Sequence, residues 1–142
     1  MPVQRTLSII KPDAVDKQKV GKIIERLQSE GFKILALKQL QLTLAQARGF
    51  YAVHRERPFF AELTAFMSRG PIVVLALERE DAIQKYRDVI GATDPAKAAA
   101  GTLRKLYGAS VGENAMHGSD APETAAVEVA YFFAGYELTP VI

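Results

Sequence analysis

Ile72-Val73-Val74-Leu75-Ala76-Leu77 is an unbroken apolar run near the middle of the chain. Its length and its β-branched residues are typical of a central strand that is covered on one or both faces. Strand and helix patterns alternate on either side of this run, so the run indicates a fold built around a buried sheet. Working outward from it gives the order of the other elements.

Upstream of the central run, the chain begins with a strand, a helix and a second strand. Residues 3–10 alternate weakly in polarity and predict a mostly buried strand. Lys11-Pro12 ends that strand, because proline cannot continue a central ladder, and the lysine should project its ammonium group at the sheet edge. Apolar residues at helical spacing predict a helix over 19–30, and a second strand follows over 32–42.

Two further helices are expected before the central run. Thr43 and Gln46 form a capping-box pattern for a short helix that ends near Tyr51. Pro58 should open the next helix at the favoured first position, and Gly70 should close it.

After the central run, the pattern predicts a helix over 81–90 and then a long loop. Residues 92–113 are rich in Gly, Ala and Pro, and a short helix can form near 102–107. A loop of this length inside a compact domain is usually functional.

The C-terminal part should contain a short strand that carries His117 and a final helix. Asp120 and Glu123 form a capping pattern for that helix, with Pro122 in its first turn. The tail after Tyr136 shows no regular pattern.

The predicted order of elements is therefore β-α-β-(αα)-β-α-loop-β-α. This order indicates the α+β class, with a ferredoxin-like βαββαβ core, an antiparallel sheet and added helices. The whole chain, residues 1–142, is expected to form one domain, because no repeat or linker interrupts it.

Composition limits the possible functions. The chain has no cysteine, which excludes disulfides and thiolate metal sites. Its net charge is +2, from 18 basic and 16 acidic residues, and it has no block of five basic residues, so we expect no specific nucleic-acid partner. No apolar run approaches the roughly 18 residues of a membrane span. The N-terminal residues enter a strand pattern directly, so we expect no signal peptide, no membrane association and a cytoplasmic location.

The stretch Asn114-Ala115-Met116-His117-Gly118-Ser119-Asp120 contains one of the two histidines of the chain. A histidine is largely neutral near pH 7 and can act as a nucleophile. Small and polar neighbours leave room for a group of the size of a phosphate. The stretch therefore indicates a reactive, closely held histidine. We assign no catalytic role to the other histidine, His54.

The sequence contains neither a G-x-x-x-x-G-K-[ST] loop nor a G-x-G-x-x-G loop. A bound nucleotide would therefore need side chains to hold its phosphates. Candidates are Lys11, Arg87 and Arg104, with Thr93 as a hydroxyl donor. Taken singly, each of these is most often a solvated surface residue.

Two motifs in this order resemble those of the nucleoside diphosphate kinase family. Asn114-x-x-His117-Gly118-Ser119-Asp120 is similar to its active-site signature, and residues 6–15 are similar to its first strand and the lysine that follows. The resemblance extends from about Arg5 to Phe133. It implies an enzyme that moves the γ-phosphate of a nucleoside triphosphate, chiefly ATP, to a nucleoside diphosphate. The phosphate would pass through a pros-phosphohistidine at His117 in a ping-pong cycle that balances ribo- and deoxyribonucleotide pools.

The resemblance also implies roles for single residues around the nucleotide. The residues that match the phosphate-binding set are Lys11, Arg87, Thr93 and Arg104. Phe59 would stack on the base, with Val111 on the other face and Leu63 nearby, although Phe59 could also be an ordinary core aromatic. Asn114 and Lys11 match contacts to the sugar hydroxyls.

Further matches lie around the histidine itself. Glu128 would accept the proton of one imidazole nitrogen and leave Nδ1 of His117 to attack, although a helix glutamate is otherwise most often exposed. Tyr51 matches a residue near the transferred phosphate, and Ser119 matches a hydroxyl that packs close to the histidine. Mg²⁺ is the implied cofactor, carried mainly by the nucleotide phosphates, and we predict no metal-binding residues.

Members of the family are homo-oligomers, and the resemblance to bacterial members leads us to expect a tetramer, with a hexamer as the alternative. Two other functions stay open from the residues alone. The chain could be a nucleotide- or nucleic-acid-binding module with an inert His117, or a phosphohistidine carrier that takes phosphate from a partner protein.

Overall fold

The computed structural model describes residues 2–139, which contain a four-stranded sheet in the order β2-β3-β1-β4. Every neighbouring pair in this sheet is antiparallel. The strands are β1 (Val3–Ile10), β2 (Lys33–Leu40), β3 (Ile72–Glu80) and β4 (Met116–Gly118). The predicted ferredoxin-like α+β fold is confirmed.

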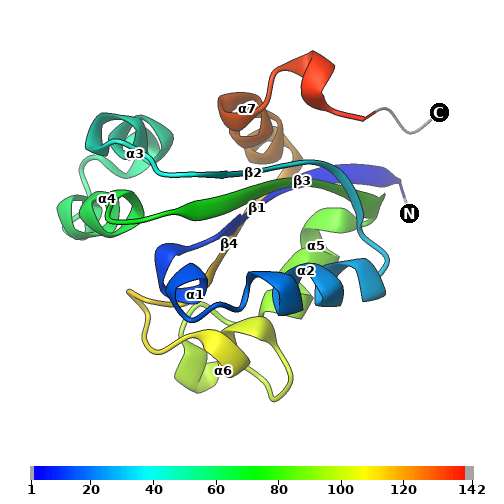
Figure 1. The fold of residues 1–142 in the computed structure, drawn as a ribbon, viewed down its shortest axis with the longest axis horizontal. Coiled ribbons are helices and arrows are strands. Elements are labelled where there is room, and N and C mark those ends of the chain that lie inside the picture. The colour runs from blue at the N-terminus through cyan, green and yellow to red at the C-terminus, as the bar shows by residue number, and fades with distance from the viewer. Residues whose placement is uncertain (1, 140–142) are drawn as a thin grey trace.

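Helices cover both faces of the sheet (Figure 1). One layer contains α1 (Pro12–Asp16), α2 (Val20–Ser29), α5 (Ala82–Ile90) and α6 (Leu103–Tyr107). The other layer contains α3 (Leu44–Phe50), α4 (Phe60–Ser68) and α7 (Pro122–Phe132). Short 3₁₀ turns lie at Ala52–His54, Pro95–Lys97 and Gly135–Glu137.

The central run is apolar throughout because β3 is buried on both faces. Val73, Leu75 and Leu77 join the core under the α2 and α5 layer. Their neighbours in the strand, including Val74 and Ala76, join the core under the α3, α4 and α7 layer. Successive side chains of a strand point to opposite faces, so one strand supplies both cores.

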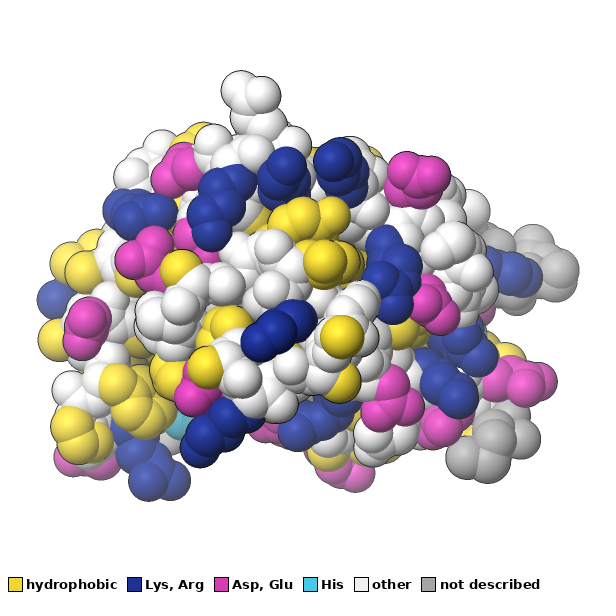
Figure 2. Space-filling view, turned by 90° about the horizontal axis from the view of Figure 1, so that it is seen from below, with side chains coloured by type: hydrophobic (Ala, Val, Ile, Leu, Met, Phe, Trp, Pro, Cys, Tyr) yellow, Lys and Arg dark blue, Asp and Glu magenta, His cyan; other side chains and the backbone are white. Residues whose placement is uncertain are grey.

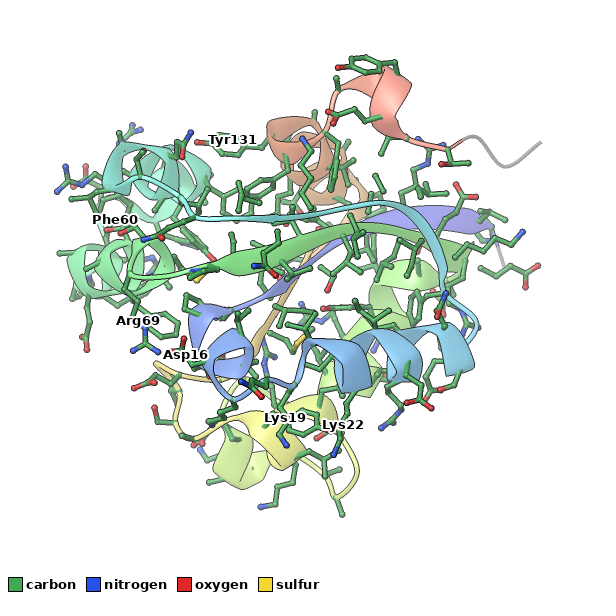
Figure 3. All side chains as sticks on the ribbon, in the orientation of Figure 1. Asp16, Lys19, Lys22, Phe60, Arg69 and Tyr131 are labelled. Carbon is green, nitrogen blue, oxygen red and sulfur yellow. The ribbon has the colours of Figure 1, made fainter. Side chains whose placement is uncertain are left out.

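Side chains also join the two helical layers at one end of the sheet. Arg69, which follows α4, donates a hydrogen bond of 3.0 Å to Asp16 at the end of α1 (Figure 3). Both side chains are exposed, so this ion pair adds little stability. On the face over α2 and α6, Lys and Arg side chains are interspersed with Asp and Glu (Figure 2).

Several element boundaries differ from the sequence predictions. Pro58 does not open the next helix, because α4 begins at Phe60. Lys11-Pro12 leads directly into the short helix α1, where Pro12 occupies the first turn. By contrast, the capping box of Thr43 and Gln46 is confirmed, with both of its hydrogen bonds present.

The predicted capping of the last helix by Asp120 and Glu123 is wrong. The N-cap of α7 is Ala121, whose backbone N–H donates to Thr124 Oγ1 at 3.0 Å. Asp120 lies outside the helix and pairs with Arg87 instead. Pro122 does occupy the first turn, as predicted.

No helix in residues 2–139 is long and apolar enough to cross a membrane.

Candidate active site

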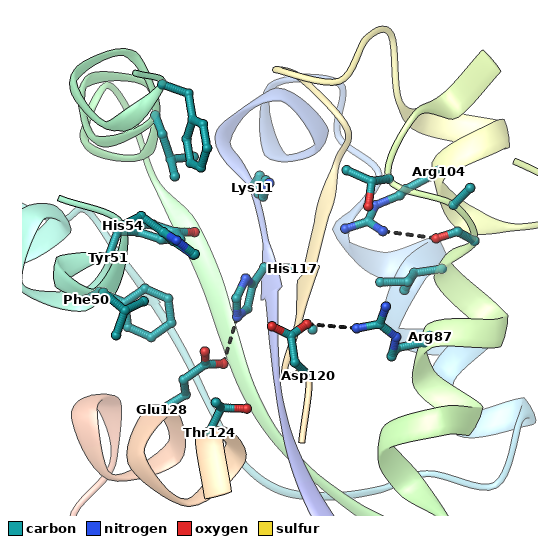
Figure 4. A pocket seen from close by; sticks show the side chains of 18 of the residues that line it. Lys11, Phe50, Tyr51, His54, Arg87, Arg104, His117, Asp120, Thr124 and Glu128 are labelled. Carbon is teal, nitrogen blue, oxygen red and sulfur yellow. Dashed lines mark hydrogen bonds and ion pairs between the residues drawn. The ribbon is translucent and has the colours of Figure 1, made fainter. Parts of the chain in front are cut away.

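His117 lies in the middle of β4, opposite Ile9 of β1. Its Nε2 lies 2.8 Å from Glu128 Oε1, on α7 (Figure 4). A carboxylate can only accept a hydrogen bond, so this contact places the ring proton on Nε2. Nδ1 is then the unprotonated nitrogen, which is the form that a nucleophilic histidine requires.

Glu128 is itself held by a second donor. Ser119 Oγ donates to the same Oε1 atom at 2.9 Å, and Ser119 Oγ in turn accepts the backbone N–H of Leu7 at 3.2 Å. Ser119 therefore contacts the carboxylate and connects it to β1. The chain Leu7–Ser119–Glu128–His117 fixes the orientation of the imidazole.

Aromatic rings line one side of His117. The ring of Phe50 meets it edge-to-face at 5.4 Å between centroids, and the ring of Tyr51 does so at 6.1 Å. His54 stacks on Tyr51 at 6.5 Å and lies 5.6 Å from Phe59. Tyr51 is buried, and its hydroxyl group has no hydrogen-bond partner within residues 2–139.

Lys11 follows β1 directly and is 7% exposed. Its ammonium group donates to Asn114 Oδ1 at 2.8 Å. Burial, helped by the charge of Arg104 and opposed by Asp13, lowers the pKa of Lys11 to about 8. Lys11 is thus a cation held out of water beside another cation, which favours the arrival of an anion.

Arg104 and Arg87 supply the other positive charges. Arg104 donates to the carbonyl groups of Gly91 at 3.0 Å and Met116 at 2.9 Å, and burial lowers the pKa of its guanidinium. Arg87 pairs with Asp120 at 2.8 Å, and both side chains are exposed. Since Arg104 binds the residue before His117, it joins the α6 segment to β4.

A pocket of about 550 Å³ opens beside His117. The predicted site residues that line it are Lys11, Tyr51, Phe59, Leu63, Arg87, Thr93, Arg104, His117 and Glu128. A second cleft of about 580 Å³ shares four of these residues and adds Val111 and Asn114. Both volumes are in the range of small-molecule sites.

Two predicted residues have contacts that the sequence did not indicate. Asn114 is buried, and its amide is engaged at both ends, since it accepts from Lys11 and donates to the Thr93 carbonyl at 3.0 Å. Ser119 is buried behind Glu128 and lines neither cleft.

Sequence reasoning missed several residues that line the pocket. Phe50, His54, Asp120 and Thr124 all lie on its wall. Asp120 stands in the quoted active-site stretch, and its carboxylate could have been considered there. No sequence signal distinguished Phe50 from an ordinary helix aromatic.

Within residues 2–139, no group of three or more His, Asp or Glu side chains could hold a metal ion. The pocket does have the exposed carboxylate of Asp120 on its wall. One carboxylate fits a Mg²⁺ ion that keeps most of its ligands as water and phosphate oxygens. The donor set therefore suits a cation that arrives on a ligand, rather than one held by the protein alone.

A ferredoxin-like sheet that presents an oriented histidine to a pocket lined by Lys11, Arg87 and Arg104 belongs to a phosphoryl-transfer enzyme. Comparison with known proteins identifies the family within this class. The family model described as nucleoside diphosphate kinase matches residues 4–138. The chain belongs to the nucleoside diphosphate kinase family.

Curated relatives and solved structures agree with the family. A nucleoside diphosphate kinase of Sorangium cellulosum is 69% identical over 140 residues, which cover 99% of this chain and 97% of that protein. One from Rhodopseudomonas palustris is 59% identical over 97% of this chain and 99% of its own length.

Among solved structures, the Aquifex aeolicus enzyme superposes with a TM-score of 0.95 at 49% identity, covering 97% of this chain and all of that one. The Halobacterium salinarum enzyme, solved in complex with CDP, superposes with a TM-score of 0.94 at 36% identity, covering 99% of this chain and 94% of that one.

Proposed function

We propose that this protein transfers the γ-phosphate of a nucleoside triphosphate, chiefly ATP, to a nucleoside diphosphate through a phosphohistidine at His117. The observation that carries the proposal is the 2.8 Å contact between Nε2 of His117 and Glu128. This contact leaves Nδ1 as the nucleophilic nitrogen of a ring that lines a pocket with the cations Lys11, Arg87 and Arg104.

The reaction proceeds in two half-cycles of the same chemistry. The Nδ1 lone pair forms a bond to the γ-phosphorus, the bond from that phosphorus to the bridging oxygen breaks, and the diphosphate leaves with the electron pair. A second diphosphate then binds in the same place. Its terminal β-phosphate oxygen attacks the phosphorus, and the N–P bond electrons return to Nδ1. The Nε2 proton stays on the ring throughout and is stabilised by Glu128.

Charge neutralisation supplies most of the catalysis in such a transfer. Lys11 is buried and Arg104 is half-buried, so their attraction to phosphate oxygens is less screened by water than at the open surface. Arg87 is exposed and would leave Asp120 to contact the ligand. Thr93 and Tyr51 line the same pocket, and we propose them as hydroxyl donors to the phosphates.

Mg²⁺ is the cofactor that we propose, brought by the nucleotide phosphates and contacted by Asp120 directly or through water. When bound, it supplies further positive charge to the phosphate oxygens.

The second cleft suits a nucleobase. Phe59 and Val111, on its wall, are exposed by 47% and 57%, so their apolar surface is open to a ligand, and Leu63 lies beside them. Stacking contributes roughly 1–3 kcal/mol per base and does not distinguish one base from another. We therefore propose that the site accepts all common bases. Asn114 and Lys11 are proposed to contact the sugar hydroxyls.

We also propose that the protein is one catalytic domain that works in the cytoplasm and assembles into a homo-oligomer, a tetramer in preference to a hexamer. The edge strand β2 supports assembly, because it lies at the end of the described sheet and Leu37 on it is 49% exposed.

The experiment that tests the function is His117→Ala. This variant should bind nucleotides with an affinity close to that of the wild type and lose phosphate transfer, because it removes the acceptor atom and leaves the cations in place. Isothermal titration and a coupled turnover assay give the two numbers. Residual turnover near the wild-type rate would exclude the mechanism.

A further inference from the structure

The backbone turn just before β4 is strained. Ala115 has a φ of +71°, a left-handed conformation that alanine rarely adopts. The N–H of Met116 donates across it to the carbonyl of Asn114 at 2.8 Å, which closes a three-residue turn. A γ-turn with positive φ is rare and strained. His117 is two residues further along, so this turn leads directly into the strand that carries the histidine.

Two hydrogen bonds hold the strained residue from outside the turn. The backbone N–H of Lys11 donates to the Ala115 carbonyl at 2.8 Å. The Ala115 N–H donates to Oδ2 of Asp13 at 3.0 Å. Ala115 itself is fully buried, so its N–H would otherwise lack a partner.

Asp13 is an unexpected partner for this task. Its side chain is 3% exposed, and its other oxygen, Oδ1, has no hydrogen-bond partner within residues 2–139. Burial raises the pKa of this carboxyl group, because the charged carboxylate loses its contact with water. The hydrogen bond from the Ala115 N–H therefore connects the Asp13 side chain to a part of the chain that is distant in sequence.

We propose that Asp13 is a positioning residue for phosphoryl transfer. Its carboxylate stabilises the strained turn at Ala115, and this turn orients His117 toward the pocket. The alternative is that Asp13 acts only as a counter-charge for Lys11, whose pKa it helps to raise. The positioning role and the counter-charge role predict different effects of substitutions at Asp13 and Ala115.

The first test separates geometry from charge at position 13. Asp13→Asn keeps an oxygen for the Ala115 N–H and loses the charge, whereas Asp13→Glu keeps the charge and displaces the oxygen by one methylene. If Asp13 positions the turn, Asp13→Asn forms the phosphoenzyme within about tenfold of the wild-type rate and Asp13→Glu is slower than Asp13→Asn. The reverse order would overturn the proposal and favour the counter-charge role.

The second test uses the strain itself. Glycine adopts positive φ without cost, so Ala115→Gly should lessen the need for Asp13. Asp13→Ala should slow phosphoenzyme formation by roughly a hundredfold in the Ala115 background, the size expected of a displaced catalytic group. In the Ala115→Gly background the loss should fall to about tenfold or less. An equal loss in both backgrounds, or none in either, would contradict the proposal.

Rapid-quench measurement of labelled protein with γ-labelled ATP and Mg²⁺ gives these rates, and thermal melting reports whether each variant folds. Asp16→Asn is the matched control, since it makes the same chemical change on the same helix at an exposed ion pair. The inference rests on the proposed function, because its readout is phosphorylation of His117. If the wild type and Asp16→Asn acquire label, the function stands, whatever Asp13 does.

Discussion

At the scale of single residues, the site depends on which nitrogen of His117 carries the proton. Glu128 Oε1 accepts from both His117 Nε2 and Ser119 Oγ. We propose that the carboxylate does two things: it selects the tautomer, and it would stabilise the positive charge that grows on the ring during transfer. Ser119 would act through the carboxylate, to which it donates a hydrogen bond while it accepts one from Leu7 of β1.

This division of roles predicts different costs for the two substitutions. Glu128→Gln keeps the shape and an acceptor oxygen but removes the negative charge, and phosphoenzyme formation should slow by roughly 10- to 100-fold. Ser119→Ala removes one neutral hydrogen bond and should slow it by less than about fivefold. Single-turnover kinetics with labelled ATP measures both. A larger effect from Ser119→Ala would show that the hydroxyl has its own chemical role.

The lowered pKa of Lys11 leads us to expect a loss of activity at alkaline pH. Its pKa is lowered to about 8, so the free enzyme loses this charge as the pH rises above 8. The groups that face it are Arg104, which lowers the pKa, and Asp13, which raises it. The value of kcat/KM should therefore fall with an apparent pKa near 8, and Lys11→Arg, although slower, should lose this limb.

The same shift acts on stability with the opposite sign. The folded pKa lies below the ordinary value of 10.5, so the unfolded chain binds more protons between about pH 8 and 10.5. The Lys11 contribution to the free energy of unfolding should rise with pH over that window, and Lys11→Met should flatten the rise. Denaturant titrations of the ligand-free wild type and Lys11→Met at pH 8 and pH 10 would test this. The prediction is contradicted if the free energy of unfolding of the wild type, relative to that of Lys11→Met, falls between the two pH values.

Most candidate residues could be proposed from the sequence because the motif around His117 is distinctive, and the structure brings nearly all of them to two adjoining clefts. The side-chain partners could not be predicted. Asn114 holds Lys11, and Asp13 holds Ala115, across more than 100 residues of sequence. No local pattern encodes contacts of that range.

Among the elements, β4 carries His117, and close packing against α5 fixes its position. The ring of Tyr86, on α5, lies against Gly118, and its hydroxyl donates to the His117 carbonyl at 3.1 Å. A Cβ atom at position 118 would lie 2.6 Å from the Tyr86 ring, closer than van der Waals contact allows. Glycine at 118 is thus required by a neighbour rather than by its own backbone angles.

Gly118→Ala should accordingly destabilise the protein by about 1–3 kcal/mol, because the clash forces α5 and β4 apart. Gly21→Ala is the control, since Gly21 lies in α2 with no atom within 4 Å of the added Cβ. That change should stabilise the protein by roughly 0.5–1 kcal/mol. Chemical denaturation measures both. Equal and small effects would mean that the contact at Gly118 relaxes freely.

Helix starts show where local sequence is sufficient and where it is not. Thr43 caps α3 as predicted because both partners of its capping box are local. The same pattern at Asp120 failed: the helix begins one residue later, with Ala121 and Thr124 forming its local cap, and the Asp120 carboxylate pairs with Arg87, distant in sequence. A local rule holds until a tertiary partner competes with it.

At the scale of the whole molecule, the alternation of strands and helices was sufficient to predict the fold. The central run is apolar at every position, which predicted a strand covered on one or both faces, and the two cores on β3 show that both faces are covered. Assembly is a different matter, because it depends on exposed surface that periodicity does not describe.

The exposed edge of β2 predicts how assembly can be disturbed. Leu37→Glu places a charge on this exposed edge strand, which should oppose pairing with a second copy and shift the protein to smaller species. Lys33→Glu is a control for added negative charge, at the start of the same strand. Sedimentation velocity at several concentrations reports the species. An unchanged oligomer would place the contact elsewhere on the surface.

A single labelling experiment shows whether His117 carries the phosphate between two nucleotides. The purified protein is incubated with γ-labelled ATP and Mg²⁺ without an acceptor, and GDP is then added. We expect label on the protein that is labile in acid and stable in base. It should be absent from His117→Ala, retained in His54→Ala and transferred to GTP when GDP is added. No label, with ATP still bound, would contradict it and leave a pocket that binds nucleotides without the chemistry.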